Sequence, residues 1–206
     1  MIEANVRVQA GEFRLAAELQ GEGVICLVGK NGTGKTTLLR AIAGLHPISE
    51  GFVKVGGKDV TRSSMDGRGV VLVTPNTCLP HLGVDSHILW GARLRGLRPQ
   101  EEYVASVKMA LGINYGGTVR DLSRGMRQRV ALGTALLASP KAILVDEAFL
   151  GLNDREAFIS EYGKLVREAG IDVIFSSQDE ADGRLADRLY VLSEGRATPR
   201  YQEPSS

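Results

Sequence analysis

The sequence predicts an α/β fold: a mostly parallel sheet flanked by helices, with an antiparallel β edge at the N-terminus and a helical subdomain near the middle. Two observations carry this prediction. Short apolar runs that suit buried strands alternate with longer stretches that suit helices, as in chains that form parallel sheets. The first of these buried runs, at 24–28, is joined to the first helical stretch by a glycine-rich turn.

Strands are expected where apolar or alternating residues are bounded by turn signals. The run at 189–192 is expected to be the last strand, and the tail at 198–206 is expected to be frayed. The expected strand ranges are 5–9 and 13–19 for the antiparallel edge, and 24–28, 70–73, 142–145, 173–175 and 189–192 for the main sheet.

Helices are expected in the stretches between the buried strands. Ser123 is placed to cap a helix that ends before Ser139-Pro140, and Gly96 to Pro99 interrupts the helical stretch before it. The expected helical ranges are 38–43, 84–113, 123–138 and 154–169.

The length of 206 residues suits a single domain. We expect a core lobe at 1–74 and 139–206, with the helical subdomain at about 75–138. Hydrophobic residues make up 43% of the chain, enough for a substantial core, and the 25 basic and 24 acidic residues nearly cancel. Because nucleic-acid binding usually needs a concentrated basic face, no nucleic-acid partner is expected.

Neither membrane insertion nor secretion is expected. No apolar run approaches the length of a membrane span, and the N-terminus lacks the basic-then-apolar pattern of a signal peptide. Cys26, in an expected strand, and Cys78, in an expected loop, suit small apolar roles better than a disulfide. The chain is therefore expected to be cytoplasmic, so that any membrane role comes through a partner.

The glycine-rich turn is the most specific motif in the sequence, because it is a complete phosphate-binding loop. Such a turn between strand and helix points several backbone N–H groups at one spot. Lys35 can then reach the β- and γ-phosphates, and the Thr36 hydroxyl can bind Mg²⁺. We therefore expect a P-loop nucleoside-triphosphatase (NTPase) core that binds a nucleoside triphosphate. The loop residues are Gly29, Lys30, Asn31, Gly32, Thr33, Gly34, Lys35, Thr36 and Thr37.

A second motif is the apolar run at 142–145, which ends in the acidic pair Asp146 and Glu147. Acids at the tip of a parallel strand lie where ligands bind in such sheets. Asp146 is the expected Mg²⁺ ligand, directly or through water. Glu147 is the expected general base that polarises the attacking water.

The segment from Leu122 to Arg129 reads Leu-Ser-Arg-Gly-Met-Arg-Gln-Arg. It resembles the signature motif of ATP-binding-cassette (ABC) ATPases, usually Leu-Ser-Gly-Gly-Gln, and precedes the acidic strand with that family's spacing. A serine, a flexible glycine and a helix N-terminus together can form an anion site. The resemblance implies that this site closes over the γ-phosphate held by a second subunit. The residues concerned are Ser123, Arg124, Gly125 and Met126.

The resemblance covers essentially the whole chain, including Leu79-Pro80-His81-Leu82 and the closing segment at 187–195. It implies an ATPase subunit with ATP and Mg²⁺ as cofactors. The subunit would pair with a second ABC ATPase subunit and drive a separate integral-membrane permease from the inner face of the cell membrane. A solute-binding protein is a further implied partner. The similarity leans towards importers of the molybdate and tungstate type. The alternative is a degenerate subunit that binds ATP, hydrolyses it poorly and fills half of a heterodimer.

Two positions depart from the family pattern and favour slow hydrolysis. Thr74 stands where the family has a glutamine that contacts Mg²⁺ and the attacking water, and a threonine side chain is too short for that reach. Ser177 stands where the family has a histidine that hydrogen-bonds the γ-phosphate, and a shift of one residue gives Ser176 instead. Loss of one transition-state donor typically slows turnover by about 10²–10³-fold.

Phe13 and the histidines have weaker assignments. Phe13 is the candidate for the aromatic residue that stacks on adenine in the family, although it also suits a core strand. The three histidines, His46, His81 and His87, are expected to have ordinary loop or surface roles rather than catalytic ones.

Overall fold

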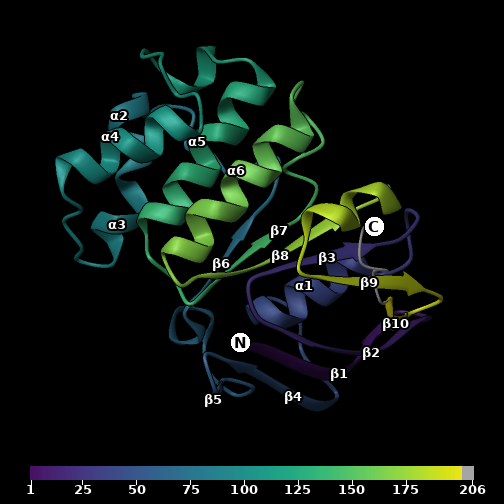
Figure 1. Ribbon diagram of the computed structural model, residues 1–206. Helices are drawn as coiled ribbons and strands as arrows, with labels where there is room; N and C mark the ends of the chain where they lie inside the picture. The colour runs from purple at the N-terminus through teal and green to yellow at the C-terminus, as the bar shows by residue number, and fades with distance from the viewer. Residues whose placement is uncertain (201–206) are drawn as a thin grey trace.

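A computed structural model of the chain describes residues 1–200 and places their strands in two sheets (Figure 1). The smaller sheet is antiparallel, in the order β2-β1-β4-β5. The larger sheet has the order β10-β9-β3-β8-β7-β6, and its strands are parallel except for β10. The strands are β1 (Ile2–Ala10), β2 (Phe13–Gly21), β3 (Val24–Val28), β4 (Glu50–Val55), β5 (Lys58–Asp59), β6 (Val70–Val73), β7 (Ala142–Val145), β8 (Asp172–Ser177), β9 (Arg188–Ser193) and β10 (Arg196–Arg200).

The helices lie in the connections between strands of the larger sheet. The longest are α5 and α6, and the shorter α2, α3 and α4 gather beside α5 (Figure 1). Three segments, η1 to η3, form 3₁₀ turns. The bounds are α1 (Lys35–Ala43), α2 (Val84–Ile88), α3 (Trp90–Leu94), α4 (Glu101–Ala110), α5 (Arg124–Leu137), α6 (Arg155–Glu168), η1 (Met65–Arg68), η2 (Val119–Asp121) and η3 (Glu180–Leu185).

Helix α1 lies between the two sheets, and its apolar side chains explain this position. Leu38, Leu39 and Ile42 are fully buried and share one core with the inward-facing residues of both sheets. In β2, buried and exposed residues alternate, so that only one face of the antiparallel sheet meets this core. The packing fixes α1 between the two sheets.

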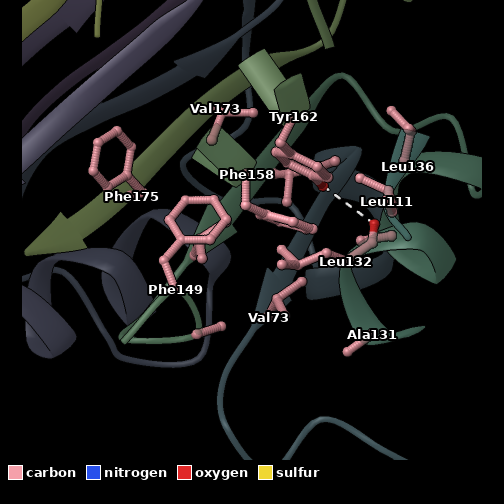
Figure 2. Close-up of a cluster of buried hydrophobic side chains, with 14 of the residues drawn as sticks. Val73, Leu111, Ala131, Leu132, Leu136, Phe149, Phe158, Tyr162, Val173 and Phe175 are labelled. Atoms are coloured by element: carbon pink, nitrogen blue, oxygen red, sulfur yellow. Dashed lines mark hydrogen bonds between the residues drawn. The ribbon is translucent and has the colours of Figure 1, made fainter. Parts of the chain in front are cut away.

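A second core lies on the opposite face of the parallel sheet, under α5 and α6. Figure 2 shows its aromatic rings gathered together, with Phe149 in edge-to-face contact with Tyr162 and Phe175 at centroid distances of 5.9 and 5.4 Å. The buried Tyr162 hydroxyl donates to the Leu132 carbonyl oxygen of α5 at 3.2 Å. This bond joins α6 to α5.

The strand register decides where the functional residues meet. Val28 pairs with Ser177, and Val145 pairs with Phe175, so that β3, β8 and β7 end at one edge of the sheet. The carboxyl edge of a parallel sheet is the usual place for ligands.

The α/β class, the parallel sheet and the antiparallel edge are confirmed, but the structure differs from the local expectations at four points. The strand at 189–192 is not the last, because β10 pairs antiparallel with β9 and includes Thr198 to Arg200, which were expected to fray. The rest of that tail, 201–206, lies outside the described residues. Strands β4 and β5 were not expected, and His87 is buried in α2 rather than at the surface.

None of the helices between residues 1 and 200 combines the length and the apolar character that a bilayer crossing requires.

Candidate functional site

The turn from β3 into α1 is built around glycines. Gly32 and Gly34 have φ of 81° and 105°, a region that favours glycine. A Cβ at Gly34 would lie 2.8 Å from Cζ of Phe13, so this position is closed to larger residues. Phe13 therefore lies directly against the loop. This position is required of an aromatic ring that is to contact a ligand in the loop.

Lys35 is the buried cation of the loop, with 5% of its surface exposed. Its Nζ donates to the carbonyl oxygens of Gly29 at 2.5 Å and Lys30 at 2.9 Å. Burial lowers the pKa of Lys35, and the nearby carboxylates of Glu147 and Asp146 oppose that shift. The structure thus brings the lysine and both acids together, with Thr36 half-buried at the next position along α1.

Asp146 and Glu147 are both oriented by Ser176. From the sequence, Ser176 was only an alternative to Ser177 for the position where the family has a histidine. The Ser176 hydroxyl donates to Oδ1 of Asp146 at 3.0 Å and accepts the Glu147 N–H at 2.9 Å. Asp146 is buried, and Glu147 is half-buried with a φ of 57°, which is unusual for a residue with a side chain. The only signal in the sequence was a polar pair ending an apolar strand.

Ser177 faces the other side of β8 and is 1% exposed. Its hydroxyl accepts from Nη2 of Arg155 at 2.9 Å and from the Asp179 N–H at 2.9 Å, and it donates to the Asp182 carboxylate. A hydroxyl has one hydrogen and two lone pairs, so this set uses its full capacity. The Ser177 carbonyl also reaches the loop, because it accepts the Gly29 N–H at 3.1 Å.

Thr74 follows β6 at the same edge of the sheet, and its hydroxyl is also engaged. Thr74 Oγ1 lies 2.9 Å from Thr77 Oγ1, and the Thr74 N–H donates to that hydroxyl at 2.8 Å. Asn76, the other polar side chain of this turn, is exposed.

The segment that resembles a signature motif lies elsewhere. Ser123 caps α5, since its hydroxyl accepts the Met126 N–H at 3.3 Å. Gly125 packs against the Gly151 carbonyl, which would be 3.0 Å from an added Cβ, and Arg124 is exposed. Helix α5 contributes to the core on one face of the parallel sheet and α1 to the core on the other. The helix that this segment begins therefore packs on the opposite face of the parallel sheet from the helix that follows the loop.

A glycine-rich loop between a parallel strand and a helix, with a buried lysine beside two strand-end acids, defines the class of this protein. It has the core of a P-loop NTPase.

The chain belongs to the ABC transporter family. The sequence model of that family, described as ABC transporter, matches residues 14–150. An sn-glycerol-3-phosphate import ATP-binding protein of Rhodopseudomonas palustris (strain HaA2) is 39% identical over 85% of this chain and 50% of the relative. A spermidine/putrescine import ATP-binding protein of Bacteroides fragilis (strain YCH46) is 36% identical over 93% of this chain and 41% of the relative. The chain thus spans about half the length of these curated relatives.

Solved structures agree on the fold. The ATP-binding subunit of an ABC transporter superimposes with a TM-score of 0.80 at 20% identity, covering 97% of this chain and 89% of the other. An ATP-binding cassette of an ABC transporter in its ADP conformation gives 0.77 at 23% identity, covering 96% and 89%.

Two expectations from the sequence gain no support from these comparisons. The relatives named above are called import proteins for sn-glycerol 3-phosphate and for polyamines, so the expected molybdate and tungstate type has no support. The alternative of a degenerate, poorly hydrolysing partner has none either.

Proposed function

We propose that the chain is the ATP-binding and ATP-hydrolysing subunit of an ABC importer for a small solute. One observation carries the proposal: the buried ammonium of Lys35 lies among the loop carbonyls and beside the Asp146 and Glu147 carboxylates, at the shared edge of β3 and β7. The two relatives named above are both import ATP-binding proteins, which supports import as the direction of transport.

The loop would hold the triphosphate. The backbone N–H groups at the end of the loop and the start of α1 would bind its phosphate oxygens, because the dipole of this helix favours anions at its N-terminus. Lys35 would exchange its bonds to the Gly29 and Lys30 carbonyls for bonds to the β- and γ-phosphates. Phe13, which already packs on Gly34, would stack on the base.

A magnesium ion fits the residues beside the loop. Thr36 and Asp146 offer the hydroxyl and carboxylate oxygens that Mg²⁺ prefers, and Ser176 orients the Asp146 carboxylate. Among residues 1–200 no three His, Cys, Asp or Glu side chains gather as a metal site, so phosphate and water would complete the shell. When bound, the ion would neutralise charge on the phosphates.

Glu147 would act as the general base that orients and deprotonates the attacking water. Its backbone N–H is fixed by Ser176, which limits where the carboxylate can reach. The Ser177 hydroxyl is fully engaged with other protein groups, and the shorter Thr74 side chain is bonded to Thr77, so neither replaces the long donor that would serve the γ-phosphate. We therefore propose that hydrolysis is slow until partners complete the site.

Those partners would be a second ATPase subunit and an integral-membrane permease. Ser123, Arg124, Gly125 and Met126, at the N-terminal end of α5, would close over the ATP of the second subunit. The permease would dock on the helical subdomain at about 75–138. An open groove of about 1120 Å³ between β6 and helices α2, α3 and α5 suits that role, and its lining includes the exposed side chains of Trp90 and Leu94. A solute-binding protein would deliver the solute to the permease.

The test is ATP binding and turnover by the purified chain. Lys35→Ala should abolish binding of a fluorescent ATP analogue with Mg²⁺. Glu147→Gln should retain binding and lower kcat by about 10²–10⁴-fold. The proposal fails if the wild-type chain does not bind ATP, or if Glu147→Gln hydrolyses it at the wild-type rate.

A further inference from the structure

Two arginines on α6 each pair with an aspartate in the connection from β8 to β9. Arg155, the first residue of α6, forms an ion pair with Asp182. Arg167, in the last turn of the same helix, pairs with Asp187 at an Nη2–Oδ1 distance of 2.9 Å. Helix α6 is thus bound to this connection at both of its ends.

The two ion pairs lie near opposite ends of β3, one at its first residue and the other at Ser177 of the neighbouring strand β8, which pairs with the last residue of β3. Asp187 accepts the N–H of Val24, the first residue of β3, at 2.7 Å. At the other end, Arg155 and Asp182 both bind the hydroxyl of Ser177. The carbonyl of Ser177 in turn accepts the N–H of Gly29, the first residue of the phosphate loop. Only the Arg155 pair is therefore connected to the loop.

Stability alone does not account for the Arg155 pair. The side chain of Asp182 is 5% exposed, and Nε of Arg155 is buried without a hydrogen-bond partner among the described residues. Burying an ion pair costs desolvation that the attraction often fails to offset, and an unpaired buried donor adds to the cost. The Arg167 pair, with both side chains more than 40% exposed, carries no such cost.

The bonds of Arg155 also restrict the motion of Ser177. Every hydrogen-bonding position of the Ser177 hydroxyl is used, which fixes its side chain and holds its carbonyl against Gly29. Arg155 itself begins α6 immediately after the segment at 148–154 that follows Glu147. A displacement of that segment would therefore be transmitted through Arg155 and Ser177 to the start of the loop.

We propose that Arg155 is a positioning residue for the phosphate loop. Through its bond to Ser177, Arg155 connects the segment after Glu147 to Gly29. The inference rests on the proposed ATP binding, and it assigns to Arg155 a role that no motif in the sequence marks. Arg155 is not itself part of the loop, and it would act by holding Ser177, whose carbonyl accepts the N–H of Gly29 at the start of the loop.

The experiment compares Arg155→Met with Arg167→Met, a matched loss of an arginine–aspartate pair from the same helix. Each variant is measured for the midpoint of urea unfolding and for the Kd of a fluorescent ATP analogue with Mg²⁺. Arg155→Met should weaken binding by about tenfold or more, as loss of an orienting partner typically does, whereas Arg167→Met should bind like the wild type.

A double variant separates positioning from stability. Arg155→Met leaves the Asp182 carboxylate buried and unpaired, so it will also lower the unfolding midpoint. Arg155→Met with Asp182→Asn removes that charge and should restore much of the midpoint without restoring ATP affinity. Arg155→Lys should behave similarly, because a lysine keeps the charge but cannot span Ser177 and Asp182 with a planar fork.

Three results would overturn the inference: wild-type affinity in Arg155→Met, equal losses of affinity in the two single variants, or recovery of affinity together with stability in the double variant. Failure of the wild-type chain to bind ATP would instead overturn the proposed function and this inference with it.

Discussion

The Ser176 hydroxyl donates a 3.0 Å hydrogen bond to Oδ1 of Asp146, and both side chains are buried. The same hydroxyl accepts the Glu147 N–H, so that one serine orients the two acids at the tip of β7. The serine lies on β8, the neighbouring parallel strand, 30 residues further along the chain. The geometry of the acids therefore depends on the register of the two strands.

Replacing Ser176 with alanine should lower kcat for ATP hydrolysis by about 10–100-fold, since a hydrogen bond to a charged group contributes about 1.5–3 kcal/mol. The Asp146 carboxylate and the Glu147 N–H would both lose a partner. Steady-state turnover tests this, with Ser106→Ala as control because the exposed Ser106 hydroxyl bonds the Tyr103 carbonyl of its own helix, α4. Equal turnover in the two variants would contradict the assigned role.

Glu147 has a backbone conformation that suits glycine better than glutamate. Replacing it with glycine should raise the free energy of unfolding by about 1 kcal/mol, because a residue with a side chain is strained in this region. Hydrolysis should be lost at the same time. Urea unfolding of Glu147→Gly and Glu147→Gln distinguishes the effects, since the glutamine variant keeps the strain. If glycine gives no gain over glutamine, the strain is not real.

The sequence predicts the loop and the acids because both are local patterns. A strand, a glycine-rich turn and a helix lie within 24–43, and the acids directly follow a run of apolar residues. The loop residues and the acids then meet because parallel strands share a carboxyl edge. These parts needed no knowledge of distant contacts.

What the sequence missed depends on distant partners. Strand β4 pairs with β1 through contacts such as Ile2 with Val55, which no local pattern reveals. Arg155 reads as an ordinary charged helix residue until the fold brings it to Ser177 and Asp182. His87 reads as a surface residue for the same reason. Side chains whose role comes from tertiary contacts cannot be assigned from a single sequence.

His87 predicts a pH dependence of stability. Its Nε2 accepts the Leu79 N–H at 3.0 Å, so the neutral ring carries its proton on Nδ1, 2.9 Å from the Thr134 hydroxyl. Burial lowers the pKa of His87 below its ordinary value of 6.5. Well above pH 6.5 the ring is neutral in both states and this contribution is complete. Below 6.5 the unfolded chain takes up the proton first, so stability falls until the pKa of the folded state is passed.

The measurement is the free energy of urea unfolding at several pH values between 5 and 8, for the wild type and for His87→Gln. Glutamine can accept from Leu79 and donate to Thr134 but does not titrate in this range. The difference in stability between the two proteins should therefore shift in favour of the variant as the pH falls. A difference that stays constant across the range would show that His87 does not contribute.

Arg68 is expected to stabilise the fold, because its buried guanidinium donates hydrogen bonds to four backbone carbonyl oxygens. Two belong to the final turn of α1, Ala41 at 3.1 Å and Ile42 at 3.0 Å, and the others belong to Thr61 and Ser63. A cation at a helix C-terminus satisfies carbonyls that lack partners and complements the helix dipole. Arg68→Met should therefore lower the free energy of unfolding by about 2–4 kcal/mol.

The control for this loss is Arg40→Met, on the exposed side of the same helix, which should change stability by no more than about 0.5 kcal/mol. Because α1 carries the phosphate loop at its other end, the position of Arg68 also predicts a functional effect. When the helix loses its C-terminal anchor, Arg68→Met should weaken ATP binding in native buffer, whereas Arg40→Met should not. If Arg68→Met unfolds at the same urea concentration as Arg40→Met, the carbonyls of α1 do not need the arginine.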